Sequence, residues 1–178
     1  MVTYAKPKVG GAISVAPVGT TLPTDATTAL AEGFNAVGYI SEDGFTNSIT
    51  RNSTDIKAWG GDTVLSVQTE FDNKYKTVFL DSIDLNVLKA IYGEANVSGS
   101  LSAGLDVKIN NKELDEMSVV VDMILKDGTL ERIVVARAKI TELGDIVYKS
   151  DDALAYEVTF TSYPDANGDC AHNYYKKS

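Results

Sequence analysis

The sequence predicts a mainly-β protein: a β-sandwich or partial barrel with one flanking α-helix, a long polar loop and extended termini. Three observations predict this class. Many segments alternate apolar and polar residues, as strands with one buried face do. Turn signals such as Asp127-Gly128 separate these segments. Only one stretch, about Asp84–Tyr92, has apolar residues at helical spacing. Many strands with a single helix favour packed layers around one core, with the helix covering an edge or an opening.

Length and composition predict a single domain spanning residues 1–178. The chain has 178 residues, of which 44% are hydrophobic and 23% charged, as in ordinary globular proteins. No apolar run is long enough to span a membrane, and no apolar stretch of a signal peptide precedes Lys8, so we expect no membrane anchor. The single cysteine, Cys170, excludes an internal disulfide and fits folding in a reducing cytoplasm.

In the N-terminal half, an arm of about residues 1–11 precedes the first strand, which Pro17 ends. Residues 41–62 form a long polar loop bounded by turn signals at both ends. Within it, 45–49 and 55–59 can pair as a small hairpin that gains little from burial. The predicted strands of this half are 12–16, 34–40, 63–69 and 74–80.

The helix and the C-terminal half follow. Asp84 or Ser82 is expected to cap the helix, Leu88 and Ile91 share its apolar face, and Gly93 ends it. Beyond the last strand, Pro164 and Gly168 end regular structure, and a C-terminal arm of about residues 164–178 is expected. The predicted strands of this half are 105–109, 118–125, 130–138, 140–148 and 154–161.

A search for chemistry finds no catalytic residue, cofactor site or metal site. His172 is the one histidine and is expected to be solvated in a polar tail, without the orienting partner that a catalytic histidine needs. Cys170 lies two residues away, but two ligands do not make a structural zinc site. The sequence also contains no GxxxxGK[ST] or GxGxxG phosphate-binding motif. We therefore expect a protein that is not an enzyme.

Two alternatives remain open. Trp59, beside Gly60-Gly61, could stack on a sugar in a monomeric β-sandwich carbohydrate-binding module, although such aromatics more often pack at a loop base or an interface. Twenty-five acidic residues guarantee accidental carboxylate pairs, so an enzyme with carboxylate chemistry requires one Asp or Glu held in an apolar pocket with a raised pKa.

The charge balance argues against nucleic-acid binding, because binding depends on Lys and Arg neutralising phosphates and the net charge is −9. Solubility is the simplest explanation of this charge. A more specific explanation of the negative charge is that the protein has a surface that must not retain nucleic acid. Strand edges, flexible arms and a polar hairpin also suit a chain that associates with copies of itself, in closed rings or filaments.

Six segments together resemble the major tail proteins, or tail tube proteins, of long flexible-tailed bacteriophages (the siphophage type), in particular the branch that infects actinobacteria. None of the six is a catalytic motif. They are Pro7–Ile13, Ala16–Ala26, Val37–Gly44, Ile56–Val64, Asn86–Gly93 and Tyr148–Glu157.

The resemblance implies a structural virion protein, synthesised in the host cytoplasm, whose six copies form a ring. The rings stack into a tube through which DNA passes during ejection without being bound. It also implies contacts with a tape-measure protein and with tail-tip and terminator proteins during assembly. Some relatives carry an additional immunoglobulin-like domain, which we do not expect in this chain.

The resemblance assigns roles to two sets of residues. The loop at about 41–62 and the terminal arms would contact neighbouring subunits and rings, and acidic residues on polar strand faces would line the lumen and repel phosphates. The candidate contact residues are Tyr4, Lys6, Phe45, Arg51, Asp55, Lys57, Trp59, Tyr174 and Tyr175. The candidate lumen residues are Asp106, Asp122, Glu131, Glu142 and Glu157.

Overall fold

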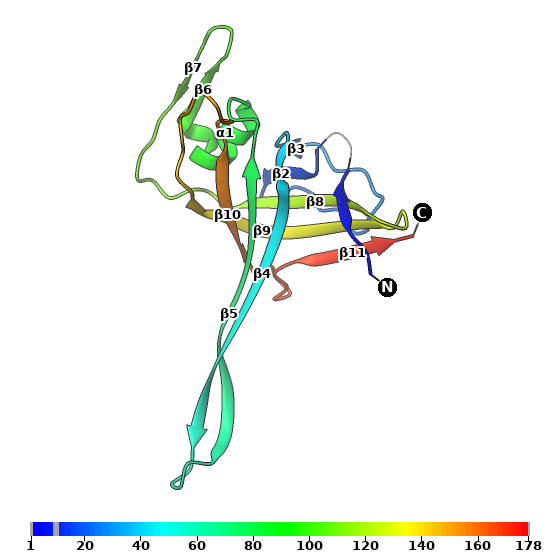
Figure 1. The fold of residues 1–178 in the computed structure, drawn as a ribbon, viewed down its shortest axis with the longest axis vertical. Coiled ribbons are helices and arrows are strands. Elements are labelled where there is room, and N and C mark those ends of the chain that lie inside the picture. The colour runs from blue at the N-terminus through cyan, green and yellow to red at the C-terminus, as the bar shows by residue number, and fades with distance from the viewer. Residues whose placement is uncertain (1, 9–10, 178) are drawn as a thin grey trace.

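A computed structural model describes residues 2–8 and 11–177, and in this part of the chain the protein is mainly β, as predicted (Figure 1). Every pairing between the described strands is antiparallel. The strands are β1 (Ala5–Pro7), β2 (Ile13–Pro17), β3 (Asn35–Ala36), β4 (Ile40–Lys57), β5 (Thr63–Phe79), β6 (Val97–Ser100), β7 (Gly104–Val107), β8 (Met117–Leu125), β9 (Leu130–Leu143), β10 (Tyr156–Tyr163) and β11 (His172–Lys176). The helices are α1 (Leu85–Tyr92) and the 3₁₀ turn η1 (Glu94–Asn96).

Nine strands form one sheet in the order β3-β2-β8-β9-β10-β5-β4, with β1 and β11 beside this path, and β6 and β7 form a second sheet. Strands β8 and β9 each pair with two shorter strands along one of their edges. β8 pairs with β2 through residues 117–121 and with β1 through 123–125. β9 pairs with β11 through 130–134 and with β10 through 137–143. Among the described residues the sheets do not close into a barrel.

The main core lies between the β5-β10-β9-β8-β2 sheet and α1. Val158 and Phe160 of β10 contribute to it, with Phe79 of β5 edge-on to Phe160. The helix is as predicted: the Asp84 carboxylate accepts the Asn86 and Val87 N–H groups at 2.8 and 3.1 Å, and Gly93 ends it with a φ of 92°. The buried face of the helix comprises Val87, Leu88, Ala90 and Ile91. The local cap and spacing therefore suffice to place this element.

The second face of the β8–β9 hairpin is covered by the loop that follows β2. Arg132 of β9 is 2% exposed and donates to the carbonyl oxygens of Asp25 and Thr28 at 3.1 and 2.6 Å. Its guanidinium also donates to both carboxylate oxygens of Asp122 at 2.6 and 3.0 Å. One buried cation thus fastens the loop to the sheet, and Ala26 of the loop is buried beside it.

The segment predicted as a long loop, 41–62, differs most from the prediction. Residues 45–49 and 55–59 do not pair with each other. Both belong to β4, an 18-residue strand that pairs with the 17-residue β5 in one long hairpin. The turn lies at 58–62, where the Ala58 N–H donates to the Asp62 carbonyl at 2.8 Å. The hairpin extends far beyond the body of the molecule (Figure 1).

Several smaller predictions need correction. The strand expected at 140–148 does not exist as such: β9 continues to Leu143, and residues 144–155 have no regular structure. The strand expected at 34–40 is reduced to the two residues of β3. The terminal arms are extended but not free, because β1 pairs with β8 and β11 pairs with β9. Residues 1, 9 and 10 of the predicted N-terminal arm and residue 178 of the predicted C-terminal arm lie outside the described residues.

Candidate assembly surfaces

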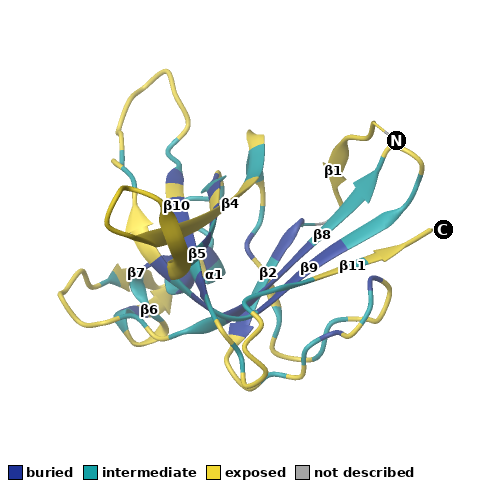
Figure 2. Ribbon diagram, turned by 90° about the horizontal axis from the view of Figure 1, so that it is seen from below, coloured by how far each residue is buried: buried dark blue, intermediate teal, exposed yellow. Residues whose placement is uncertain are grey.

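The outer part of the β4–β5 hairpin, Thr46–Phe71, is exposed at every residue, and we call it the arm. Figure 2 looks along the arm and shows it in the colour of exposed residues, in front of the buried strands of the sheet. Seven large apolar side chains nevertheless lie on it: Ile49, Ile56, Trp59, Val64, Leu65, Val67 and Phe71. An isolated two-stranded hairpin is at best marginally stable in water. The arm is therefore a surface that gains from contact with another molecule.

A β-bulge divides the arm into two parts with apolar residues on opposite faces. Arg51 pairs with Phe71 and Asn52 with Glu70, but Ser53 pairs with Gln68, so that β5 holds one extra residue. Ile49 and Phe71 lie before the bulge, on the face that continues into the core. By strand alternation, the Ile56–Leu65 and Thr54–Val67 pairs beyond the bulge share the other face. The arm thus presents two separate apolar surfaces, one near its base and one near its tip.

The tip itself carries the only tryptophan of the chain. Trp59 is fully exposed in the turn between β4 and β5. Asp55 and Lys57, also candidate contact residues, lie beside it on β4 and are exposed. Arg51 lies closer to the base, with its guanidinium 4.6 Å from the centre of the Phe71 ring. Four of the five candidate contact residues of this segment are therefore on the arm.

The fifth, Phe45, is placed elsewhere. Its ring stacks on Tyr75 with the ring centres 5.1 Å apart, and it packs against the core of its own chain. Below the arm, an open groove of about 590 Å³ separates Ile49, Phe71 and Tyr75 from residues 168–171 of the C-terminal segment. Phe45 thus supports the base of the arm from inside the molecule.

The candidate contact residues of the termini lie on or next to β1 and β11, which flank the turn end of the β8–β9 hairpin, and the two termini lie on the same side of the molecule (Figure 1). Tyr4 and Lys6 are exposed, with the Lys6 ammonium 5.4 Å from the centre of the Tyr4 ring. On β11, Tyr175 is exposed and donates its hydroxyl to Glu131 at 2.8 Å, whereas Tyr174 is half-buried and stacks on His172. Both termini therefore have exposed aromatic side chains, held on short edge strands.

One face of the β4-β5-β10-β9 sheet is polar and uncovered, and two of the candidate lumen residues lie on it. Glu157 of β10 is paired with Lys76 of β5 at 2.8 Å. Glu142 of β9 lies 3.8 Å from Lys74. The residue register places these four side chains on one face, opposite the core. This surface is a mosaic of opposite charges instead of a row of free carboxylates.

The other three candidate lumen residues lie in different places. Asp106 is exposed on β7 of the small second sheet. Glu131 accepts the Tyr175 hydroxyl at the far end of β9. Asp122 has a largely buried side chain, 14% exposed, and both its oxygens are bound by Arg132. The structure does not bring the five carboxylates together on one face.

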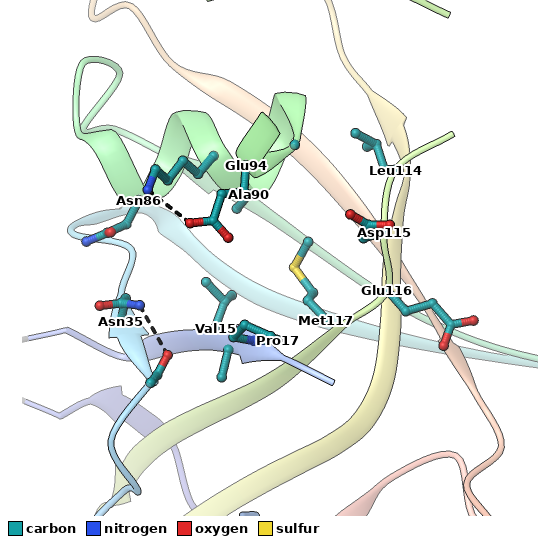
Figure 3. A pocket seen from close by; sticks show the side chains of 14 residues that line it. Val15, Pro17, Asn35, Asn86, Ala90, Glu94, Leu114, Asp115, Glu116 and Met117 are labelled. Carbon is teal, nitrogen blue, oxygen red and sulfur yellow. Dashed lines mark hydrogen bonds and ion pairs between the residues drawn. The ribbon is translucent and has the colours of Figure 1, made fainter. Parts of the chain in front are cut away.

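A second groove, of about 350 Å³, lies between α1 and the β2–β8 edge (Figure 3). Two charged pairs lie at this groove: Lys89 pairs with Glu94 at 3.2 Å, and Arg137 donates to both oxygens of Glu116. The hydrogen bonds from Arg137 lower the pKa of Glu116. Glu116 is therefore not the carboxyl of raised pKa that carboxylate acid–base catalysis needs.

Comparison with known proteins then decides the class of this chain. A family model described as phage tail tube protein matches residues 8–177. The chain belongs to the phage tail tube protein family. Tail tube proteins of this family are structural, so the prediction that the chain is not an enzyme is confirmed. The search of curated proteins finds no match.

Eleven chains of solved structures also match this tail tube protein. One is in the cryo-EM structure of the anti-feeding prophage cap, the cap that terminates the AFP tube. It has a TM-score of 0.50 and 9% sequence identity, and the match covers 97% of this chain and 93% of that chain. At this identity the likeness concerns the fold alone. The described part of this tail tube protein has no helix long and apolar enough to cross a membrane.

Proposed function

We propose that this tail tube protein forms hexameric rings that stack into the tube of a phage tail, and that DNA passes through the tube during ejection. The observation that carries the proposal is the arm. Its 26 residues, Thr46 to Phe71, are all exposed, yet they include seven large apolar side chains. A monomeric protein gains nothing from such a segment, whereas a repeating assembly gives every arm a partner.

The gain available at the tip can be sized from the exposed apolar side chains. Fully burying one exposed Ile, Leu or Val side chain contributes about 1.5–3 kcal/mol. Ile56, Leu65 and Val67 beyond the bulge are about half exposed, so burying the rest of them offers about 2–5 kcal/mol per subunit before the costs of ordering are subtracted. Because each subunit in a ring or a stack repeats the contact, even a modest net gain is multiplied along the tube.

The two parts of the arm suit two different contacts. The arm is long enough to leave its own subunit, and its tip surface faces away from the surface near its base. In the proposed tube, the tip packs on a subunit of the neighbouring ring, with Trp59, Asp55 and Lys57 at the contact. The base, with Arg51 and Phe71 beside the open groove, packs on a subunit of the same ring.

The exposed aromatic residues of the termini, Tyr4 and Tyr175, supply the complementary contacts in this proposal. Tail-tip, terminator and tape-measure proteins would meet the same surfaces at the ends and in the lumen of the tube. The siphophage type and an actinobacterial host remain predictions from the sequence resemblance. Synthesis in the host cytoplasm before incorporation into the virion belongs to the same proposal.

Electron microscopy of concentrated protein tests the proposal directly. We expect hollow tubes with a regular ring repeat and six subunits per ring. A double variant, Ile56→Thr with Leu65→Thr, keeps β-propensity but removes the opposed apolar pair of the tip, and it should abolish tubes while the protein stays folded by circular dichroism. Leu101→Thr, at another exposed leucine outside the arm, is the matched control and should still form tubes. Tubes formed by the double variant would contradict the role of the arm.

A further inference from the structure

Three potential metal ligands meet where the chain turns from β10 into β11. Asp165 and Asp169 lie on the turn, and His172 is the first residue of β11. The Nε2 atom of His172 lies 3.8 Å from Oδ2 of Asp165 and 3.9 Å from Oδ2 of Asp169. One ligand atom of each of the three side chains lies within 4.8 Å of the others.

These separations are too long for hydrogen bonds between the groups, which require about 3.2 Å or less. They are close to what a shared metal ion requires. Ligand atoms held at about 2.0–2.2 Å around a tetrahedral zinc ion are about 3.3–3.6 Å apart. The two nitrogen–oxygen separations exceed this range by only a few tenths of an ångström, and the separation between the two carboxylates, which is at most 4.8 Å, can close by rotation of their side chains. The three groups thus surround a common centre instead of bonding to one another.

The backbone prepares Asp165 for this role. Its Oδ1 accepts the N–H groups of Asn167 and Asp169 at 2.7 and 3.0 Å, which fixes the carboxylate and leaves Oδ2 directed at the imidazole. Only 19% of this side chain is exposed. Within residues 2–8 and 11–177, no Lys or Arg forms an ion pair with Asp165 or Asp169. Two neighbouring carboxylates without a cationic partner favour the binding of a cation.

His172 is also better placed than its sequence context suggests. It belongs to a strand paired with β9 opposite Val134, and its ring stacks on Tyr174 with the ring centres 6.0 Å apart. A metal-binding histidine needs a rigid element and groups that orient its ring. His172 has both, because it lies on a paired strand and two carboxylates lie near one of its ring nitrogens. The imidazole comes from a different element than the turn, so the cluster is more than a run of acidic residues.

We propose that Asp165, Asp169 and His172 bind a divalent transition-metal ion, with Zn²⁺ as the fitting species. One imidazole nitrogen with two carboxylate oxygens is a ligand set that Zn²⁺ accepts, and its fourth position is left for water or a partner's side chain. Ca²⁺ and Mg²⁺ prefer oxygen ligands alone. The bound ion would fasten the start of the edge strand β11 to the turn that precedes it. The proposal does not depend on tube formation.

The test uses the untagged full chain after treatment with a chelator, titrated with zinc sulfate. Because His172 is the only histidine, its imidazole signals in an NMR spectrum are unambiguous. We expect them to move in a saturable manner with one equivalent of zinc, and calorimetry to give a stoichiometry of one. Imidazole signals that do not respond to zinc would overturn the proposal.

Variants separate the proposed site from other sources of binding. Asp165→Asn keeps an oxygen that can accept the two backbone N–H groups, so the turn should survive. We expect this change and Asp169→Asn each to weaken zinc binding by at least about tenfold, the minimum seen even for groups that only support metal ligands. Cys170→Ser and Asp62→Asn, at the exposed tip of the arm, should bind zinc as the parent does. Loss of binding in Cys170→Ser, with full binding in the two aspartate variants, would also overturn the proposal.

Discussion

Removing the carboxylate of Asp122 tests how the structure stabilises the deeply buried guanidinium of Arg132. Arg132 is 2% exposed, and its guanidinium donates four hydrogen bonds: two to the Asp122 carboxylate and one each to the carbonyl oxygens of Asp25 and Thr28. In the variant Asp122→Ala the guanidinium keeps its two carbonyl partners but loses its counter-ion. Lys8, whose ammonium lies 3.9 Å from Asp122, then adds a second uncompensated positive charge nearby.

The expected cost is large because a buried charge remains without its partner. Breaking a buried ion pair from one side costs about 3–5 kcal/mol. For a chain of 178 residues with a urea m-value near the upper end of about 1–3 kcal/mol/M, this lowers the unfolding midpoint by about 1–2 M. Glu157→Ala is the matched control. Its pair with Lys76 is as short, 2.8 Å, but both side chains are about half exposed, so the cost should stay below about 1 kcal/mol.

The assay is urea unfolding of the two variants and the parent at pH 7, followed by circular dichroism. Asp122→Ala should unfold at clearly lower urea than Glu157→Ala, and the loop over the second sheet face should lose protection from hydrogen exchange. Equal midpoints for the two variants would refute the reasoning. Asp122 would then be a surface carboxylate, free to act at a lumen wall as the sequence predicts.

Three further predictions follow from single residues. Trp59→Ala should leave the free energy of unfolding of the isolated chain within about 0.5 kcal/mol of the parent, because the side chain is fully exposed, but weaken tube formation. In the parent, tryptophan emission should shift to shorter wavelength on assembly, and unchanged emission would count against a contact at the tip. Hydrogen bonds from Thr28 and Thr27 lower the pKa of Asp25 from 3.8, so its stabilising effect is present above 3.8 and is lost as the pH falls through the lowered value. Asp25→Asn should therefore show a smaller loss of thermal stability on acidification below that pH, and an unchanged pH profile would contradict this. Gly38→Ala should lower the melting temperature more than Gly104→Ala: both have positive φ, but only at Gly38 would a Cβ overlap the Asp81 carboxylate that accepts the Tyr39 N–H.

The elements that the sequence predicts well are those with local causes. The helix has its cap at Asp84 and its stop at Gly93, and the β8–β9 hairpin has Asp127-Gly128 at its turn. The arm has no such signature. Its strands bury neither face within the chain, so the alternation of polar and apolar residues that marks a strand is absent from Thr46 to Thr54. A strand that is stabilised by a partner outside the chain looks like a loop in the sequence.

The ligand cluster at the C-terminus was missed for a related reason. Asp165, Asp169 and His172 are close in sequence, but their meeting depends on β11 pairing with β9, some 40 residues away. No local pattern predicts that pairing. The spacing of two aspartates four residues apart, followed by the one histidine three residues later, is the signal that was available. It becomes informative only once the turn and the strand are known.

Charge is a second respect in which sequence alternation and structure diverge. Alternation correctly places Glu142 and Glu157 on the polar face, but it cannot show that Lys74 and Lys76 of a distant strand lie beside them. A carboxylate paired at a few ångströms acts on distant phosphates mainly as a dipole, and at physiological salt even a free charge is screened beyond about 8 Å. If these two residues line the proposed tube, they therefore contribute little to repelling DNA.

The same polar face continues onto the base of the arm, and there the balance changes. Glu70 and Asp72 of β5 lie opposite Asn52 and Thr50 in the register, on the side of Lys74 and Lys76. Glu70 accepts a hydrogen bond from Asn52 at 2.6 Å, and in the described part of the chain neither carboxylate forms an ion pair with Lys or Arg. If this face lines the tube, its negative potential is concentrated where each arm leaves the body. In a stack of rings this gives one acidic band per ring, separated by charge-balanced zones. In the proposed tube, repulsion of DNA phosphates by this face would therefore recur once per ring and would not form a continuous acidic wall.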